Sequence, residues 1–295
     1  MNRLTKLARD LRVESLLVLA ALIWGLTFVV VKDAIERVPP FSFLAWRFLL
    51  AAAALMILRP RCLRGLTKEA WKAGGWLTLA LYAGYAFQTI GLQYTTASNS
   101  AFITGLFVVL VPLIAALVLR RVPSPAALGG VVLATAGLAL LSLGPSLRLA
   151  KGDTLMLGCA VAFAVHILLL GAYAPRFGAY PLVVMQLAGS GLLHAVSATA
   201  GRDSLAFPLE WKLAGAVALC GLLASAGAFL IQVRAQETIP PTRTAVILTM
   251  EPVFAGVFGY LLAGEVLTGR GWTGSGLILA GMLVAELLAP EREAT

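Results

Sequence analysis

The chain has 295 residues, of which 60% are hydrophobic and only 13% charged, and its formal net charge is +9. A soluble domain carries about 25% charged residues, so the composition excludes ordinary soluble domains and favours a protein with several membrane spans. The positive charge does not indicate nucleic-acid binding, because the lysines and arginines are spread among short loops without a basic face.

Apolar runs between charged, glycine or proline positions predict ten membrane-spanning helices. In chain order their ranges are 15–37, 41–59, 71–95, 98–119, 125–144, 153–174, 180–200, 211–236, 242–263 and 270–289. Each run is close to the ~20 residues that cross a bilayer. The predicted fold class is therefore an all-α polytopic membrane protein.

The distribution of lysine and arginine predicts the orientation of these spans. With ten spans, the two termini and every second connection lie on one side of the membrane, which receives fifteen of the 23 basic residues. The positive-inside rule then places the N- and C-termini in the cytoplasm. We expect a multi-pass protein of the plasma (inner) membrane, for which a monomer is plausible.

Motifs of catalysis and metal binding are absent from the sequence. Cys62, Cys159 and Cys220 show no CxxC or Cys/His spacing, so neither a disulfide framework nor a zinc site is predicted. No nucleotide-binding, metalloprotease or serine-hydrolase motif occurs, and no long hydrophilic insertion interrupts the spans. We expect no catalytic residues, no metal and no cofactor.

The two halves of the sequence resemble each other. Pairs recur at an offset of 144 positions: Gly130 and Gly274, Gly137 and Gly281, Gln88 and Gln232, Ala101 and Ala245. In earlier spans an offset of 139 pairs Arg47 with Gln186 and Trp24 with Phe163. Each half holds five spans, an odd number, so the second half must run opposite to the first. This predicts inverted-topology repeats at 14–145 and 152–289, with a substrate site near the midplane; chance similarity of Gly/Ala/Leu-rich helices is the alternative.

Three stretches carry a resemblance to a known family. IWGLTF (23–28), WRFLLAA (46–52) and EPVFAGVFGYLLAGEVLTGRGWTGSGLILAGM (251–282) resemble the drug/metabolite transporter superfamily, EamA type, and most closely its YddG-type exporters of aromatic and other amino acids. The resemblance covers nearly the whole chain. It implies ten helices in two inverted bundles and the export of small metabolites. Arg120 and Arg121 depart from the family pattern, in which an acidic residue often follows the fourth span.

Aromatic and polar residues on two spans form candidate cavity faces. Trp24, Thr27 and Phe28 share one face of the first helix, and Tyr82, Tyr85 and Thr89 share one face of the third. Such faces suit apolar or aromatic amino-acid side chains, although each tyrosine alone is equally explained by an interhelical hydrogen bond. The expected substrate-binding residues are Trp24, Thr27, Phe28, Tyr82, Tyr85, Gln88, Thr89, Thr104, His166 and Met250.

Two prolines within spans are expected to bend their helices. Pro112 and Pro252 each remove a backbone donor and free a carbonyl one turn earlier, which could accept a substrate ammonium group. Glu251, directly before Pro252, is a carboxylate near mid-span that needs a partner or a proton. It either lines the pathway as a protonatable group or, as a neutral acid, hydrogen-bonds across helices to hold the kink. The second interpretation is favoured, because no second acid lies opposite it.

Other charged or titratable residues have competing interpretations. His166 lies at a depth similar to that of Glu251, so the two could form a proton relay, but a histidine that only joins two helices explains it equally well. His194 is expected at the membrane interface. Lys32 and Arg47 are expected to reach the outer membrane surface as anchors; attraction of a substrate carboxylate, or neutralisation of an acid, is the alternative.

The connection between the ninth and tenth spans is short and polar. Glu265 and Arg270 flank it and are expected to be solvated.

These observations favour a secondary transporter that exports amino acids by alternating access, with proton coupling as an option. Cationic drugs or nucleotide-sugar-like metabolites are the alternative substrates on the same fold, although cations would favour more buried acid than Glu251 alone. An intramembrane enzyme would need a nucleophile–base or metal constellation, and a channel a continuous polar lining. The sequence supports neither. The expected partners are a small-molecule substrate and the lipid bilayer.

Overall fold

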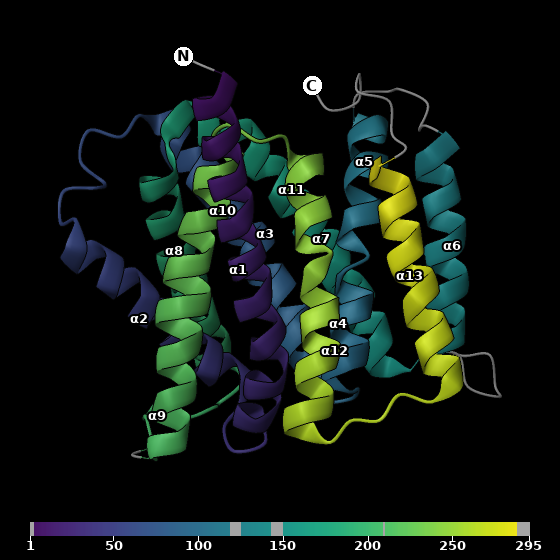
Figure 1. Ribbon diagram of the computed structural model, residues 1–295. Coiled ribbons are helices and arrows are strands. Elements are labelled where there is room, and N and C mark those ends of the chain that lie inside the picture. The colour runs from purple at the N-terminus through teal and green to yellow at the C-terminus, as the bar shows by residue number, and fades with distance from the viewer. Residues whose placement is uncertain (1–2, 119–124, 143–149, 209, 288–295) are drawn as a thin grey trace.

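This computed structural model describes residues 3–118, 125–142, 150–208 and 210–287, and within these ranges every regular element is a helix. Figure 1 shows the helices side by side along a common direction. Their bounds are α1 (Arg3–Ile35), α2 (Pro40–Leu58), α3 (Lys68–Leu92), α4 (Ala97–Thr104), α5 (Phe107–Val118), α6 (Pro125–Ser142), α7 (Lys151–Phe177), α8 (Ala179–Ala200), α9 (Trp211–Ala218), the π-helix η1 (Leu219–Gly227), α10 (Ala228–Gln236), α11 (Pro241–Leu248), α12 (Met250–Ala263) and α13 (Gly269–Leu287). The predicted span ends at 119, 144 and 289 lie outside the described residues.

Several helix ends follow from local residue chemistry. The side chain of Thr67 accepts a hydrogen bond from the backbone of Ala70 at the start of α3. Thr96 does the same for the N–H of Asn99 at the start of α4, so both helices have threonine N-caps. α12 ends at Gly264, which has a φ of 64° and adopts the left-handed conformation that favours glycine.

Seven segments of the described chain are long and apolar enough to cross a membrane. They are Val13–Ile35, Pro40–Leu58, Ala97–Val118, Lys151–Phe177, Ala179–Ala200, Trp211–Gln236 and Arg243–Ala263. Helices also form over the other three predicted spans, as α3, α6 and α13, but these are not among the seven segments. The protein is therefore an all-helical, multi-pass membrane protein.

Two of the long segments contain a break in the helix. α4 and α5 are separated at Gly105 and Leu106, and α11 and α12 are separated at Thr249. The break at Thr249 comes just before Pro252, which has no N–H to donate to the carbonyl of Leu248. Gly105 and Thr249 are 144 positions apart, which is the offset that relates the two halves.

Pro112 does not mark the break in the fourth predicted span. It lies inside α5, and the interruption occurs seven residues earlier, at Gly105. The two interruptions therefore correspond between the halves more closely than the two prolines do. A helix interruption thus lies close to Pro252, whereas α5 is continuous through Pro112.

A third segment changes its helical winding. Between α9 and α10, the nine residues of η1 wind as a π-helix, and the hydroxyl of Ser225 donates to the carbonyl of Cys220 at 2.8 Å. π-Helical segments are rare and are found frequently at functional sites. Side chains from α1 and α2 bond to this stretch: the indole N–H of Trp24 to the carbonyl of Ala224, and Nε of Arg47 to Oγ of Ser225.

The tightest contacts between helices join the two halves of the chain. α6 and α13 lie against each other at one side of the molecule (Figure 1), α2 packs on α8, α3 on α7, and α1 on α12. A Cβ atom on Gly137 would lie 2.5 Å from the carbonyl oxygen of Gly274, and one on Gly281 would lie 2.6 Å from that of Gly130. Small residues let α6 and α13 approach this closely, as is common between membrane helices.

Candidate substrate-binding site

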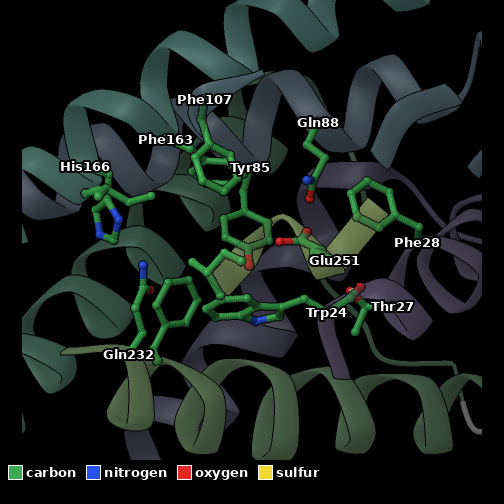
Figure 2. Close-up of a pocket in the computed structure, with 13 residues that line it drawn as sticks. Trp24, Thr27, Phe28, Tyr85, Gln88, Phe107, Phe163, His166, Gln232 and Glu251 are labelled. Atoms are coloured by element: carbon green, nitrogen blue, oxygen red, sulfur yellow. The ribbon is translucent and has the colours of Figure 1, made fainter. Parts of the chain in front are cut away.

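A pocket lies inside the bundle and receives residues from both halves of the chain. In this conformation the pocket is narrow, with a cavity volume of about 40 Å³. Figure 2 shows its side chains converging from several helices. The lining residues are Trp24, Thr27, Phe28, Tyr85, Gln88, Phe107, Phe163, His166, Ile167, Phe229, Gln232, Leu248 and Glu251.

One face of α1 forms part of this lining, as its helical spacing predicts. Trp24 and Phe28 are buried, and the indole N–H of Trp24 donates to the carbonyl of Ala224 in η1 at 2.8 Å. The hydroxyl of Thr27 donates back to the carbonyl of Trp24. A Cβ on Gly25 would lie 2.9 Å from the carbonyl oxygen of Glu251, so this glycine allows α1 to pass close to α12 beside the pocket.

Aromatic rings from four helices make the apolar wall. The ring of Tyr85 lies 5.3 Å, centroid to centroid, from Phe163, and that of Trp24 lies 5.3 Å from Phe229. Phe229 also meets the ring of His166 edge-on at 6.0 Å. Offset and edge-to-face arrangements of this kind are favourable between aromatic rings. The wall offers an apolar, aromatic surface to a substrate side chain.

The polar groups of the pocket are few and incompletely paired. Glu251 has 9% of its surface exposed, and no hydrogen bond or ion pair to its carboxylate is found among the described residues. Gln232 is 3% exposed, and its side-chain oxygen has no hydrogen-bond partner there. Buried polar groups are almost always hydrogen-bonded, so unpaired ones that face a pocket suit a ligand. Within the described chain, no cross-helix hydrogen bond from Glu251 holds the kink at Pro252.

The lining residues come in pairs related by the offsets between the halves. At an offset of 139 the pairs are Trp24 and Phe163, Thr27 and His166, and Phe28 and Ile167. At an offset of 144 the pairs are Tyr85 and Phe229, Gln88 and Gln232, and Phe107 and Glu251. The pocket is thus built from equivalent positions of both halves. The carboxylate has no acidic counterpart, because Phe107 stands at the equivalent position.

His166 does not form the predicted pair with Glu251. Both residues line the pocket, but a ring nitrogen of His166 lies 2.6 Å from the side-chain oxygen of Gln186 on α8. Figure 2 shows His166 and Glu251 on different sides of Tyr85. Similar depth did not bring the two side chains together, because depth along a helix gives no information on which way a side chain turns around the axis. His166 thus joins α7 to α8, and it makes no contact with Glu251 that would support a proton relay.

Four other expected site residues lie outside the pocket lining. Tyr82 bonds through its hydroxyl to Oγ of Ser197 at 2.7 Å, and Thr104 points to the sulfur atoms of Met156 and Cys159. Thr89 is buried but does not line the pocket, and Met250 has 38% of its surface exposed on the outside of the bundle. Trp24, Thr27, Phe28, Tyr85, Gln88, His166 and Glu251 are the expected residues that the structure brings together.

Six lining residues were absent from the sequence-based candidates, namely Phe107, Phe163, Ile167, Phe229, Gln232 and Leu248. The similarity of the two halves could have identified two of these residues. Phe163 was already matched with Trp24, and Gln232 with Gln88, so the candidates of one half pointed to their counterparts in the other.

Arg47 does not lie at the membrane surface, contrary to the anchoring interpretation. It is 1% exposed, and its Nε donates to Oγ of Ser225 at 2.8 Å. Its Nη2 donates to the hydroxyl of Tyr85 at 3.3 Å, and its Cζ lies 4.7 Å from the centre of the Tyr85 ring. Because α2 faces the bundle at this position, the side chain points inward to the pocket lining. Lys32 donates instead to the backbone carbonyl of Thr95, in the connection between α3 and α4.

His194 is also buried, although it was expected at an interface. It has no exposed surface and packs against Tyr82, with ring centroids 4.6 Å apart. Its Nδ1 contacts the carbonyl of Ser190, one helical turn earlier. Aromatic neighbours from α2 and α3 cover it, so its position near the end of a span did not bring it to water.

Glu265 is not simply solvated but caps a helix. Its carboxylate accepts the backbone N–H groups of Ala97 at 2.7 Å and Ser98 at 2.9 Å, and the hydroxyl of Ser98 at 2.6 Å. A carboxylate at a helix N-terminus is favourable both as a cap and through the helix dipole. Glu265 therefore ties the end of α12 to the start of α4. Arg120 and Arg121, which follow the fourth predicted span, lie outside the described residues.

Replacing Glu265 with alanine is expected to destabilise the protein by about 1–2 kcal/mol, the usual cost of a lost N-cap. The midpoint of thermal unfolding in detergent should fall by several degrees. Glu36→Ala, at an exposed glutamate of the connection between α1 and α2, is the matched control and should leave the midpoint unchanged. Equal midpoints for the two variants would show that the cap contributes nothing.

No metal site accompanies the pocket in the described parts of the chain. There, no group of three or more His, Cys, Asp or Glu side chains could hold a metal ion. Cys62, Cys159 and Cys220 are all free thiols.

The long apolar helices and the pocket enclosed by them define a polytopic membrane protein. The chain belongs to the EamA-like transporter family of the drug/metabolite transporter superfamily, whose family model matches it twice, at residues 11–143 and 150–286. An uncharacterized transporter from Archaeoglobus fulgidus is 34% identical over 251 residues, covering 85% of this chain and 78% of the relative. A second uncharacterized transporter of that organism is 29% identical over 273 residues, covering 85% and 89%.

The fold is also found in a solved structure. The crystal structure of another protein superposes on this chain with a TM-score of 0.70 at 20% sequence identity, and the match covers 94% of this chain and 98% of the other. The family and the relatives together make the chain a membrane transporter.

Proposed function

We propose that this transporter exports small metabolites, chiefly amino acids including aromatic and apolar ones, by alternating access across the plasma membrane. In this proposal the chain crosses the membrane ten times, with both termini in the cytoplasm. Residues 14–145 and 152–289 form two five-helix repeats of opposite orientation. Substrate binds in the pocket between them.

The pattern of helix contacts supports the inverted repeat. If the ten spans are split into two sets of five, α2 packs on its counterpart α8, and α6 packs on its counterpart α13. Other contacts occur in pairs that an exchange of the two halves relates to each other. The contact of α3 with α7 corresponds to that of α10 with α1, and the contact of α1 with α12 corresponds to that of α7 with α4. The contact of α3 with α8 corresponds to that of η1 with α2. A two-fold relation between the halves produces such reciprocal pairs. Secondary transporters commonly have this plan and bind substrate at the repeat interface.

The observation that carries the proposal is the composition of the pocket. Aromatic rings supply the apolar wall, and the carboxylate of Glu251 faces the interior without a partner in the described chain. A carboxylate in this setting suits an ammonium group, and the rings suit an apolar or aromatic side chain. An amino acid carries both groups. The two helix breaks flank the pocket, since the lining residue Phe107 follows the break at Gly105 and Leu106, and the lining residue Leu248 precedes the break at Thr249.

The same carboxylate favours a second candidate, the export of cationic drugs. A hydrophobic cation would place its charge at Glu251 and its rings against Tyr85 and Phe229. Nucleotide-sugar-like substrates fit less well, because their phosphates would meet the carboxylate of Glu251. The cation candidate differs from the amino-acid proposal in needing no group that binds a carboxylate.

Transport by the purified protein in liposomes tests the proposal. Proteoliposomes are loaded with labelled amino acids, and efflux and uptake are followed with and without a proton gradient. The proposal expects saturable movement of apolar and aromatic amino acids that protein-free liposomes lack. No movement of any amino acid would refute it, and movement of hydrophobic cations alone would establish the second candidate.

Enlarging the pocket should change substrate preference. Trp24→Ala removes a wall of the pocket, so the ratio of tryptophan to alanine transport should rise about tenfold, which is the scale of discrimination by apolar pockets. Trp76→Ala is the matched control, because Trp76 is 58% exposed and lies outside the pocket lining. Rates are normalised to the amount of reconstituted protein. An unchanged ratio in a well-folded Trp24→Ala variant would remove Trp24 from the binding site.

A further inference from the structure

The side chain of Arg47 is a buried positive charge that lacks a negative partner among the described residues. It is 1% exposed, and no carboxylate in the described chain lies within ion-pair distance of it. A guanidinium group has five N–H donors. Nε donates to Ser225 and Nη2 to Tyr85, while Nη1 has no hydrogen-bond partner in the same part of the chain. The group therefore keeps unused donors inside the bundle.

Packing alone does not account for the charge. Burying an arginine without an acid is costly, in a membrane bundle above all, and such residues usually mark a functional site. The second half provides an internal comparison, because Gln186 stands at the equivalent position, 139 residues later. Gln186 is also fully buried and is bonded to His166. A neutral polar side chain thus fills this position in one repeat, and only the other repeat carries a cation.

Tyr85 connects Arg47 with the pocket. The guanidinium lies over the ring of Tyr85, with Cζ 4.7 Å from its centre, and Tyr85 lines the pocket. Figure 2 shows Tyr85 in the middle of the pocket, with the Glu251 carboxylate beside it. The contact from Nη2 to this hydroxyl is 3.3 Å, longer than the usual 2.9–3.0 Å of such bonds. It is a weak contact that a carboxylate would outcompete, since charge-assisted bonds are shorter and stronger.

We infer that Arg47 binds the carboxylate of the substrate, which reaches it when the side chain of Tyr85 gives way, while Glu251 faces the ammonium group. This rests on the proposed function and narrows it to zwitterions: α-amino acids with a free carboxylate. One arginine balances one negative charge. A phosphate dianion would leave charge uncompensated and would be repelled by Glu251. Ser225, held by its own bond to the carbonyl of Cys220, fixes the guanidinium in place.

Four ligands with the same phenyl group distinguish the contribution of the substrate carboxylate from that of its ammonium group. L-Phenylalanine has both groups, 2-phenylethylamine lacks the carboxylate, L-phenylalaninamide neutralises it, and 3-phenylpropionate lacks the ammonium group. Binding is measured on purified full-length protein as the ligand-dependent shift in thermal unfolding, and transport as competition with labelled phenylalanine in proteoliposomes. For the wild type, phenylalanine should bind at least tenfold more tightly than phenylalaninamide or phenylethylamine.

The key variant is Arg47→Gln, which introduces the side chain that the other repeat already carries at Gln186, so that it is expected to fold. In this variant phenylalanine should lose at least tenfold in affinity, and its advantage over phenylethylamine should disappear. Arg47→Lys should restore part of the preference. Arg64→Gln, at an exposed arginine of the connection between α2 and α3, is the matched control and should behave as wild type. If Arg47→Gln does not fold, the comparison of the four ligands on the wild-type protein tests the inference by itself.

The outcomes separate this inference from the proposed function. If the wild type moves phenylalanine and phenylethylamine equally well, or if Arg47→Gln keeps the wild-type KM and preference, the inference is overturned and amino-acid transport stands. If the wild type moves no amino acid, the proposed function fails. In that case 3-phenylpropionate still tests the arginine: binding that disappears in Arg47→Gln supports a carboxylate site, and absent or unchanged binding overturns it.

Discussion

Replacing Glu251 with glutamine is expected to abolish the response of transport to a proton gradient while amino-acid exchange continues at saturating substrate with a raised KM. Glutamine keeps the shape of the side chain and can still hydrogen-bond, but it has no proton to release. A charged carboxylate near mid-span costs about 2.5–3.5 kcal/mol on insertion scales. The Glu251 carboxylate is therefore stabilised by binding either a proton or a substrate ammonium group. Because the two compete for the same carboxylate, substrate movement is coupled to proton movement. The measurement is gradient-driven efflux and zero-gradient exchange in the same proteoliposomes.

The matched control for this variant is Glu69→Gln, which alters an exposed glutamate in the first turn of α3. It should show the wild-type response to the gradient. A Glu251→Gln protein that remains fully gradient-dependent would assign Glu251 to the structure of the helix break. If Glu251→Gln shows no exchange, its thermal unfolding curve tells whether the protein is folded. If it is not folded, Glu251→Asp, which keeps a titratable carboxylate, is measured in its place.

Introducing leucine at Gly137 or at Gly281 is expected to prevent the assembly of the two halves. The Cβ atom alone would lie 2.5 Å from the carbonyl oxygen of Gly274 in the first case and 2.6 Å from that of Gly130 in the second. These obstacles are backbone atoms that cannot rotate away, so α6 and α13 must separate. Overpacking of this kind costs about 1–3 kcal/mol or more. Both variants should lose most of the monodisperse peak in fluorescence-detected size-exclusion chromatography.

Gly276→Leu is the control on the same helix. A Cβ at Gly276 meets no atom within 4 Å, so the side chain faces open space and should be tolerated. Gly137→Leu and Gly281→Leu should also have similar effects, because each glycine approaches the same kind of backbone atom in the opposite half, as the proposed two-fold relation requires. A normal elution profile for either variant would contradict the close contact.

The helices could be predicted from the sequence because hydropathy and length determine them. The predicted spans agree with the described helices to within several residues, apart from α1, which begins at Arg3 and extends through the polar N-terminal stretch. The break before Pro252 was expected from the missing backbone donor. The break at Gly105 was not, because glycine in a membrane helix is usually tolerated and gives no stop signal of its own.

The site was harder to predict because it depends on how each helix is rotated. On α1 the aromatic and polar residues share one narrow face, so the spacing of Trp24 and Phe28 was sufficient. On α3 the candidates spread over a wider arc, and only Tyr85 and Gln88 turned to the pocket while Tyr82 turned to α8. Arg47 was misplaced for the same reason. Depth along a helix suggested a side chain that reaches the surface, whereas the rotation of α2 directs it inward.

Counterflow is the measurement that tests the central claim, a carrier that exposes one pocket to each side of the membrane in turn. Proteoliposomes loaded with a high concentration of unlabelled phenylalanine are diluted into buffer that contains a trace of labelled phenylalanine. Alternating access predicts that label accumulates transiently above its external concentration, because each outward trip of unlabelled substrate returns the site for an inward one. Label that only equilibrates would indicate a channel, and label that does not enter would contradict amino-acid transport altogether.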